Sequence, residues 1–306
     1  MTQAVVKIDH LQKSFGKFQA LKNITFDVQA GEVFGFIGPN GAGKSTTIRV
    51  LLGILRASGG TATIFNEDVW QRAVSIHNRI AYVPGDVYLW PNLTGGEMID
   101  FLLKLNHQQH SQKTDELIKA FELDPKKKSR TYSKGNRQKV ALIAALSTAA
   151  DLYIFDEPTS GLDPLMEELF QKQVLALKRQ GKSVLLSSHI LSEVERMCDR
   201  IGIIRSGEIV ETGTLDQMRQ LTRTLVSVQT KRALTGVAAL AGVHGFKADE
   251  QVANKASFAV DTAQIGAVIA DLSQREIVAL QTTPPTLEDL FIRYYNTEGT
   301  EGHDAK

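Results

Sequence analysis

The stretch that decides the fold is "GPNGAGKST", Gly38 to Thr46. It matches the pattern G-x-x-x-x-G-K-[ST], and it lies between the apolar run "EVFGFIG" (Glu32 to Gly38) and a helical run from Lys44 to Leu55. The glycines allow a loop whose amide N–H groups point at one anion, and the amino end of the helix adds partial positive charge. A glycine-rich turn with a solvated lysine would not need this strand–loop–helix context. We therefore predict a phosphate-binding loop.

Each side chain in this loop has a predicted role. Lys44 reaches the β- and γ-phosphates of a nucleotide and counts as catalytic, the Ser45 hydroxyl binds Mg²⁺, and Thr46 contacts the α-phosphate. The backbone of the preceding residues would surround the phosphates: Gly38, Pro39, Asn40, Gly41, Ala42 and Gly43. ATP and Mg²⁺ are the cofactors that such a loop predicts.

Two carboxylates end a second apolar run, "DLYIFDEP", from Asp151 to Pro158. The four apolar residues indicate a buried strand, and ligands bind at the carboxyl edge of an open parallel sheet. Asp156 would hold Mg²⁺, and Glu157 would orient or deprotonate the attacking water. Taken alone, the pair is also compatible with a plain acidic strand end; beside a phosphate loop it predicts hydrolysis.

A third segment, "YSKGNRQKV" (Tyr132 to Val140), is basic and precedes an apolar helix. By itself it is compatible with a solvated loop, a phosphate contact or an RNA-binding patch. The chain has 35 Lys and Arg against 34 Asp and Glu, a net charge of +1. Because nucleic-acid binders usually carry a strong basic excess, we expect no nucleic-acid partner.

With these motifs in order, residues 5–215 resemble the ATP-binding cassette (ABC) family. Phe15, in "SFGKFQAL", lies where the family has an aromatic residue stacked on adenine. "YSKGNRQKV" lies where the family has its signature, usually Leu-Ser-Gly-Gly-Gln. "SGLDP" (Ser160 to Pro164) matches the loop that crosses the dimer interface, and His189 matches the histidine that senses the γ-phosphate.

The resemblance implies a head-to-tail homodimer with ATP at both seams. Ser133, the Gly135 amide and the helix amino end would bind the γ-phosphate held by the other subunit's loop. Asn136 and Asp163 are included among the nucleotide-binding residues, and His189 among the catalytic ones. The implied fold is α/β: a P-loop NTPase cassette with a mainly parallel core sheet, an antiparallel N-terminal β subdomain and a helical subdomain that carries the signature.

The sequence departs from the family pattern at two places. Tyr132, Lys134 and Asn136 replace the usual Leu, first Gly and Gln. Lys134 would either add charge near the γ-phosphate or be solvated, and we expect it to be solvated. Gly85, in "YVPGDVY", stands where the family usually has a Gln that reaches Mg²⁺; we hypothesise that Asp86 or a water takes this role.

The pattern of apolar and polar residues changes after Thr222, where strand-like runs with alternating residues and one helical run predict a small C-terminal α+β domain. We expect a nucleotide-binding domain over residues 1–221, an accessory or regulatory domain over 222–295 and a disordered tail over 296–306. "TLEDLFIRYY", Thr286 to Tyr295, predicts a short helix in the accessory domain.

The composition points to the cytoplasm. Cys198 is the single cysteine, so no intramolecular disulfide can form, and its helical context predicts a core residue. The N-terminus has no apolar signal-peptide core, and the most apolar stretch (Val140 to Phe155) is shorter than the ~20 residues that span a bilayer. We expect a peripheral protein on the cytoplasmic face of the membrane, held by separately encoded permease subunits.

Three surface features remain open at this stage. Tyr88 and Trp90 lie in a Pro- and Asn-bearing loop, which in the family docks the membrane subunit, although simple packing would also explain them. His107 and His110 predict an exposed loop, because no nearby acid or cysteine completes a metal site. The apolar face of the following helical subdomain is expected in the core: Met98, Ile99, Phe101, Leu102 and Leu105.

The leading functional hypothesis is the ATPase subunit of an ABC transporter, in the drug- and antibiotic-exporting branch. A soluble ABC ATPase, for example in cluster assembly, is the alternative from another class. A non-catalytic regulatory cassette is disfavoured because Lys44, Glu157 and His189 are all present. The transported substrate is not encoded here.

Overall fold

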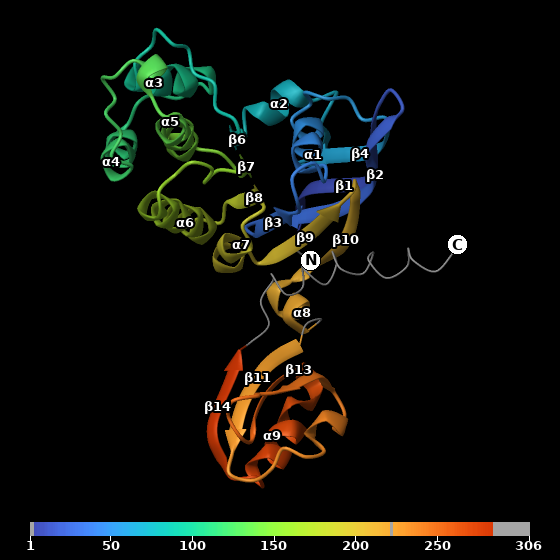
Figure 1. Cartoon of the computed structure of the whole chain (residues 1–306). Coiled ribbons are helices and arrows are strands. Elements are labelled where there is room, and N and C mark those ends of the chain that lie inside the picture. Colours follow the sequence, from blue (N-terminus) through green and yellow to red (C-terminus); the bar gives the residue numbers. More distant parts are fainter. Residues whose placement is uncertain (1–2, 221–222, 284–306) are drawn as a thin grey trace. The chain divides into compact units, whose positions relative to one another are not determined.

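The computed structural model describes residues 3–220 and 223–283, and the chain divides into two compact units, Met1–Gly213 and Thr214–Lys306 (Figure 1). The division falls ahead of the boundary predicted at residue 221, so that α8 (Leu215–Gln220) belongs to the second unit. The predicted helix Thr286–Tyr295 and the tail 296–306 lie outside the described residues.

The centre of the first unit is a parallel sheet made from the most apolar runs of the chain. β3 (Val33–Ile37), β7 (Leu152–Asp156) and β8 (Ser183–Ser188) are buried along their whole length. They pair in parallel, with β6 (Ile80–Val83) and β9 (Arg200–Arg205) beside them. Strands covered on both faces need such continuous apolar sequences. The mainly parallel core sheet is therefore confirmed.

Antiparallel strands extend this sheet on one side. β1 (Ala4–Phe15) pairs with β2 (Phe18–Gln29) and with β4 (Gly59–Ile64), and the short β5 (Glu67–Asp68) follows at the edge. The full order is β5-β4-β1-β2-β10-β9-β3-β8-β7-β6, in which β10 (Glu208–Thr214) runs parallel to β2. The antiparallel N-terminal β subdomain is thus also present.

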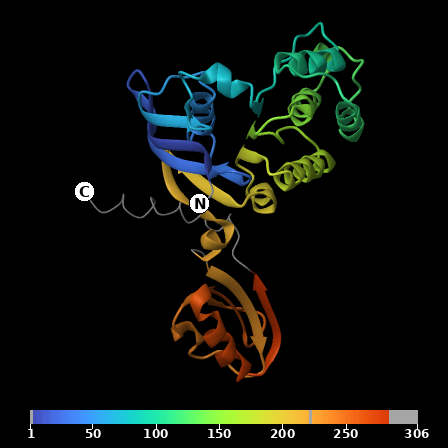
Figure 2. The same ribbon diagram turned by 180° about the vertical axis from the view of Figure 1, so that it is seen from behind.

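Helices occupy two places in the first unit. Four helices lie beside the sheet: α1 (Lys44–Leu51), α2 (Ala73–His77), α6 (Pro164–Arg179) and α7 (Leu191–Met197). α3 (Gly95–Leu105), α4 (Gln112–Ala120) and α5 (Lys134–Ser147) lie together beyond β6 in both views, with the 3₁₀ turn Ser129–Thr131 before α5 (Figures 1 and 2). This group is the predicted helical subdomain.

Two sequence expectations need correction here. α1 stops at Leu51 instead of Leu55, because Gly53 turns the chain with a φ of 64° and a Cβ there would lie 2.6 Å from the Val69 carbonyl oxygen. In α3, Leu105 is 61% exposed, and Leu103 is buried in its place. Leu103 follows Ile99 by four residues and shares its helix face, whereas Leu105 points away.

The second unit has its own sheet and core. β11 (Arg223–Thr230), β12 (Val243–Ala248), β13 (Lys255–Asp261) and β14 (Ile277–Thr283) form an antiparallel sheet in the order β12-β13-β11-β14. α9 (Ile265–Ser273) follows the 3₁₀ turn Thr262–Gln264, and a further turn spans Val237–Ala239. Side chains from β11, β13 and α9 form the core, including Val226, Phe258 and Leu272. The α+β class predicted for this region is confirmed.

Two further predictions can be compared with the structure. Cys198 is 6% exposed and lies in the core, as expected. In the part of the chain that the structure describes, no helix is both long enough and apolar enough to cross a membrane.

Candidate active site

The phosphate loop has the predicted context, because β3 ends at Ile37 and α1 begins at Lys44. Gly41 and Gly43 adopt φ values of 81° and 117°, a region that other residues rarely enter. A Cβ on Gly38 would lie 2.3 Å from the Ile204 carbonyl oxygen. The loop therefore needs glycine at three of its positions for reasons of backbone geometry and space.

Lys44 is held at the centre of this loop. Its side chain is 5% exposed, and its Nζ donates to the carbonyl oxygens of Gly38 (2.6 Å) and Pro39 (3.2 Å). The same Nζ lies 3.1 Å from Oε1 of Glu157. A buried ammonium group must be paired, and here carbonyls and one carboxylate share it.

Glu157 links Lys44 to His189. The Glu157 Oε2 atom lies 2.5 Å from Nδ1 of His189, and the Glu157 amide donates to the Ser187 carbonyl (3.1 Å). Glu157 has a φ of 50°, which is uncommon for a residue with a Cβ and directs its carboxylate off the end of β7. Lys44, Glu157 and His189, the three residues predicted to be catalytic, thus form one connected chain of contacts at the carboxyl edge of the parallel sheet.

The Mg²⁺-binding candidates differ in their surroundings. Asp156 is 5% exposed and accepts a hydrogen bond from the Ser187 hydroxyl (2.5 Å). Burial and the Asp156 charge raise the pKa of Tyr82 to about 12. Ser45 is half-buried at the start of α1. A carboxylate and a hydroxyl beside a phosphate loop are oxygen ligands that suit Mg²⁺, which usually keeps waters and substrate phosphates as its other ligands.

Gly85 and Asp86 lie next to this acidic pair in different ways. A Cβ on Gly85 would lie 3.2 Å from the Asp156 carbonyl oxygen and 3.6 Å from Glu157 Cβ, so Gly85 contacts the backbone of the acidic pair. Asp86 is exposed and makes no hydrogen bond or ion pair to the described residues. The proximity of this loop to the site is shown, whereas the metal role of Asp86 stays a hypothesis.

The signature segment forms a second anion-binding candidate. Ser133 is the N-cap of α5, and its hydroxyl accepts from the Asn136 amide (3.3 Å). A Cβ on Gly135 would lie 2.3 Å from the Gly161 carbonyl oxygen, so α5 begins tightly against the "SGLDP" loop. Within the described ranges, no hydrogen bond or ion pair joins this segment to the phosphate loop.

Lys134 is exposed, as expected, and its side chain also contacts the neighbouring loop. Its Nζ donates to the Ser160 hydroxyl (2.7 Å), and its stem lies 3.4 Å from where a Gly161 Cβ would be. The long side chain can cross the "SGLDP" loop because Gly161 leaves room for it. In the same loop, Asp163 caps α6 by accepting from the Met166 amide (3.1 Å).

Phe15 and Ser187 show what the sequence could and could not indicate. Phe15 lies at the end of the β1–β2 hairpin with 47% of its surface exposed, and Lys13 Nζ lies 4.9 Å from its ring centroid.

Ser187, which contacts both Asp156 and Glu157, was not among the predicted site residues. The signal for it was a pair of hydroxyl residues in the otherwise apolar run "SVLLSSH".

His107 and His110 are exposed, as expected, but two acids lie near His110. Its ring nitrogens contact Asp100 (2.6 Å) and Asp115 (3.0 Å), and these hydrogen bonds raise the pKa of His110. The acids come from α3 and α4, which only the tertiary fold brings together. Among the described residues, no set of three His, Cys, Asp or Glu side chains is arranged to hold a metal ion.

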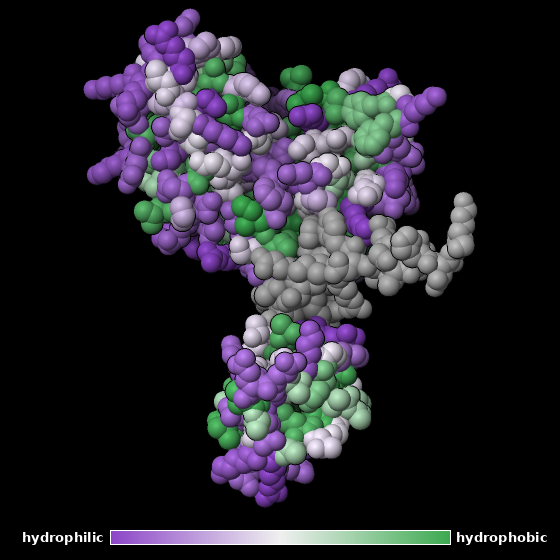
Figure 3. All heavy atoms as spheres, in the orientation of Figure 1, coloured by the Kyte–Doolittle hydropathy of each residue, from purple (hydrophilic) through white to green (hydrophobic). Residues whose placement is uncertain are grey.

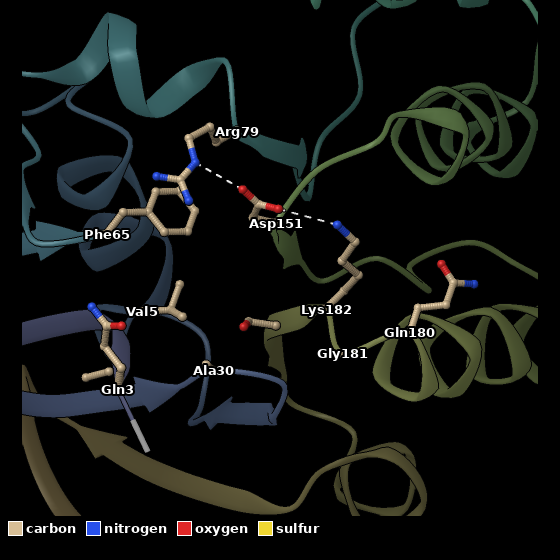
Figure 4. A pocket seen from close by; sticks show the side chains of 11 residues that line it. Gln3, Val5, Ala30, Phe65, Arg79, Asp151, Gln180, Gly181 and Lys182 are labelled. Atoms are coloured by element: carbon tan, nitrogen blue, oxygen red, sulfur yellow. Dashed lines mark hydrogen bonds and ion pairs between the residues drawn. The ribbon is translucent and has the colours of Figure 1, made fainter. Parts of the chain in front are cut away.

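A separate cavity of about 350 Å³ lies at the amino ends of the parallel strands, away from Lys44 (Figure 4). Asp151 accepts there from Arg79 (3.0 Å) and Lys182 (3.4 Å), and Arg79 stacks 3.7 Å from the Phe65 ring centroid. Burial alone would raise the pKa of Asp151, but the two cations lower it. None of the predicted site residues lines this cavity, and its charges pair with one another.

Comparisons with known proteins identify the family of the chain. The sequence model of the family described as "ABC transporter" matches residues 21–160. The chain is 38% identical over 66% of its length to an uncharacterised ABC transporter ATP-binding protein of Synechocystis, of which it spans 58%. It is 32% identical to the linearmycin resistance ATP-binding protein LnrL of Bacillus subtilis, over 94% of this chain and 97% of that one.

A solved structure gives the same result for the fold. A dimeric, post-hydrolysis form of the ATP-binding cassette MJ0796, bound to ADP and phosphate, superimposes with a TM-score of 0.62 and 25% identity. The superposition covers 69% of this chain and 98% of that one. Together with the connected Lys44–Glu157–His189 contacts beside a phosphate loop, these likenesses show that the chain belongs to the ATP-binding proteins of ABC transporters, a family of ATPases.

Proposed function

We propose that two copies of this chain dock head to tail around two ATP molecules and hydrolyse them to drive a separately encoded exporter. The observation that carries the proposal is the contact chain Lys44–Glu157–His189 at the carboxyl edge of the sheet. In this scheme Lys44 binds the β- and γ-phosphates, Glu157 deprotonates the attacking water and His189 contacts the γ-phosphate. Ser45 and Asp156 would hold Mg²⁺, which would neutralise phosphate charge.

The dimer part of the proposal rests on the second anion site. The amino end of α5 offers the Ser133 hydroxyl, the Gly135 amide and a partial positive charge, but no lysine–Mg²⁺ apparatus. It makes no hydrogen bond to its own phosphate loop within the described residues, so a γ-phosphate held by another copy is its natural ligand. Phe15, exposed at the hairpin, would stack on adenine. The MJ0796 cassette, whose solved structure is dimeric, supports the dimerisation in this proposal.

The permease would dock beside the helical subdomain. Tyr88 is 89% and Trp90 54% exposed, in the segment between β6 and α3. Tyr88 lines a mostly apolar cavity of about 240 Å³ between β6, α3 and α5, and Trp90 packs on Phe101 of α3, with ring centroids 4.4 Å apart. On the face shown in Figure 3, hydrophilic side chains cover much of the region over these helices. Exposed aromatic residues next to an apolar cavity are typical of a protein interface. Such docking would place the ATPase at the cytoplasmic face of the membrane.

Export of an antibiotic or drug is the finer part of the proposal. It is supported by LnrL, whose name describes resistance to linearmycin and which matches this chain along almost its whole length, the second unit included. The transported compound would be selected by the permease, a separate chain that contains the substrate path.

The first test is the oligomeric state of Glu157→Gln with and without Mg-ATP, measured by light scattering. We expect an ATP-dependent dimer, because the variant binds ATP without hydrolysing it, and we expect Ser133→Arg to abolish that dimer. Ser111→Arg is the matched control, since Ser111 is the exposed N-cap of α4. A protein that binds ATP but stays monomeric, alone and with its permease, would contradict the head-to-tail arrangement.

A further inference from the structure

A buried carboxyl group lies behind the proposed catalytic pair. Glu193, on α7, is 3% exposed. Its Oε2 accepts hydrogen bonds from the hydroxyls of Thr159 (3.1 Å) and Ser188 (3.3 Å). Thr159 follows Glu157 by two residues, and Ser188 directly precedes His189. One carboxylate oxygen therefore holds the loop of the proposed general base and the loop of the proposed γ-phosphate contact.

These bonds close a ring. The Ser188 hydroxyl also accepts from the Ile190 amide (2.9 Å), so Ser188 is bonded to Glu193 on one side and to Ile190, the other neighbour of His189, on the other. On the other side, His189 Nδ1 lies 2.5 Å from Glu157 Oε2. The ring runs from Glu157 through Thr159, Glu193, Ser188 and His189 back to Glu157.

Keeping a carboxyl group at this place is energetically costly. Burial raises the pKa of Glu193, and the nearby charges of Glu167 and Glu157 act in the same direction. Its other oxygen, Oε1, makes no hydrogen bond within the described part of the chain. A buried polar group is tolerated where its hydrogen bonds are needed. Here they tie together the segments that follow β7 and β8.

We propose that Glu193 is a positioning residue for ATP hydrolysis, which holds the Glu157 loop and the His189 loop in one mutual geometry. The proposal rests on the roles proposed above for Glu157 and His189. Loss of the bridge should lower kcat, because the base and the γ-phosphate contact would move apart, and should leave nucleotide affinity unchanged, because the phosphate loop is bonded elsewhere.

The test is steady-state ATP hydrolysis by the full chain, together with binding of a fluorescent ATP analogue. We expect Glu193→Ala to lower kcat by about ten- to a hundredfold, as small misplacements of catalytic groups do. Glu193→Gln should retain most of kcat, because an amide oxygen can accept from the same two hydroxyls. Glu32→Gln is the matched control: Glu32 is 9% exposed, and burial also raises its pKa, but it lies at the amino end of β3.

Single-arm variants keep the proposal testable if Glu193→Ala fails to fold. Thr159→Val removes only the hydrogen bond to Glu193, whereas Ser188→Ala also removes the acceptor of the Ile190 amide, and each should lower kcat. In the Glu193→Gln background, which keeps the acceptor, each should lower kcat by the same factor as in the parent protein. If Glu157→Gln kept full activity, the proposed function would fall and the inference with it. If Glu157→Gln were inactive while Glu193→Ala and both single-arm variants matched Glu32→Gln, only the inference would be overturned.

Discussion

At the scale of single residues, Gly135 shows how space at one position links two motifs. The amino end of α5 lies so close to the "SGLDP" loop that a Cβ on Gly135 would be 2.3 Å from the Gly161 carbonyl oxygen. Gln138, one turn later, donates to the Pro158 carbonyl (3.0 Å), and Lys134 bonds to Ser160. The segment proposed to bind the partner's γ-phosphate is therefore fixed to the loop that follows Glu157.

We expect Gly135→Ala to weaken ATP-dependent dimerisation and to lower the free energy of unfolding by about 1–3 kcal/mol, the usual cost of an overpacked site. The physical reason is that backbone, not a flexible side chain, opposes the new methyl group. Light scattering of Gly135→Ala in the Glu157→Gln background and chemical unfolding measure the two effects. Gly266→Ala, in α9, is the control, because a Cβ there meets nothing within 4 Å. Equal behaviour of the two variants would contradict this account.

At the scale of elements, the three adjacent strands β6, β7 and β8 are joined by charges where they begin. Arg79 precedes β6, Asp151 precedes β7 and Lys182 precedes β8, and Asp151 pairs with both cations. All three side chains are between 30% and 49% exposed. Solvent screens such pairs, so this network contributes modestly and through its connectivity more than through any single contact.

We expect Asp151→Asn to cost about 0.5–1 kcal/mol of unfolding free energy at neutral pH, the upper part of the range for exposed pairs. The pKa of Asp151 is lowered in the fold, so its contribution is present above the usual value of 3.8 and is lost as the pH falls through the lowered value. Urea unfolding followed by tryptophan fluorescence is suitable, since Trp70 and Trp90 both lie in the first unit.

The control for this prediction is Glu168→Gln, which removes one exposed i,i+4 pair with Lys172 on α6. It should cost less than Asp151→Asn, because only one partner is lost. If the free energies of unfolding of Asp151→Asn and of the parent protein still differed in acid, packing and not charge would account for the effect.

At the scale of the whole molecule, the chain has two units with separate cores. The second unit buries Val226, Val228, Phe258 and Leu272 between its own sheet and α9. Phe258 is 3% exposed and stacks on Phe246, with ring centroids 5.7 Å apart. Because each unit can satisfy its apolar side chains by itself, we expect the two to unfold as separate cooperative transitions.

Scanning calorimetry of the full chain tests this expectation. Mg-ATP should raise the transition of the first unit only, because ligand binding stabilises the unit that binds it. Phe258→Ala should destabilise the second unit by about 3–5 kcal/mol and leave the other transition in place. Leu225→Ala, which removes a side chain that is 48% exposed in the same unit, is the control. If the chain showed a single transition, and both Mg-ATP and Phe258→Ala shifted it, the two units would not be independent.

Much of the architecture could be read from the sequence, because it depends on local patterns. The apolar runs that became β3, β7 and β8, and the loop before Lys44, carry their signals within a few neighbouring residues. β12 was not predicted: its sequence, "VHGFKA", mixes apolar and polar residues, and its place beside β13 depends on long-range pairing. The end of α1 was missed because a steric contact between Gly53 and Val69 decides it. Leu105 was assigned to the wrong helix face, since Leu103, four residues after Ile99, is the buried residue.

The sequence by itself determined the phosphate loop and the acidic pair, since each is a short motif whose chemistry needs particular residue types in a row. The order of these motifs carried the family resemblance, which implied the cassette architecture. Only the tertiary structure decided which other side chains serve these motifs. Glu193 meets Thr159 across 34 positions of the chain, and Lys134 meets Ser160 across 26. No local pattern encodes such contacts, because they exist only after the sheet has brought the ends of separate strands and helices to the same edge.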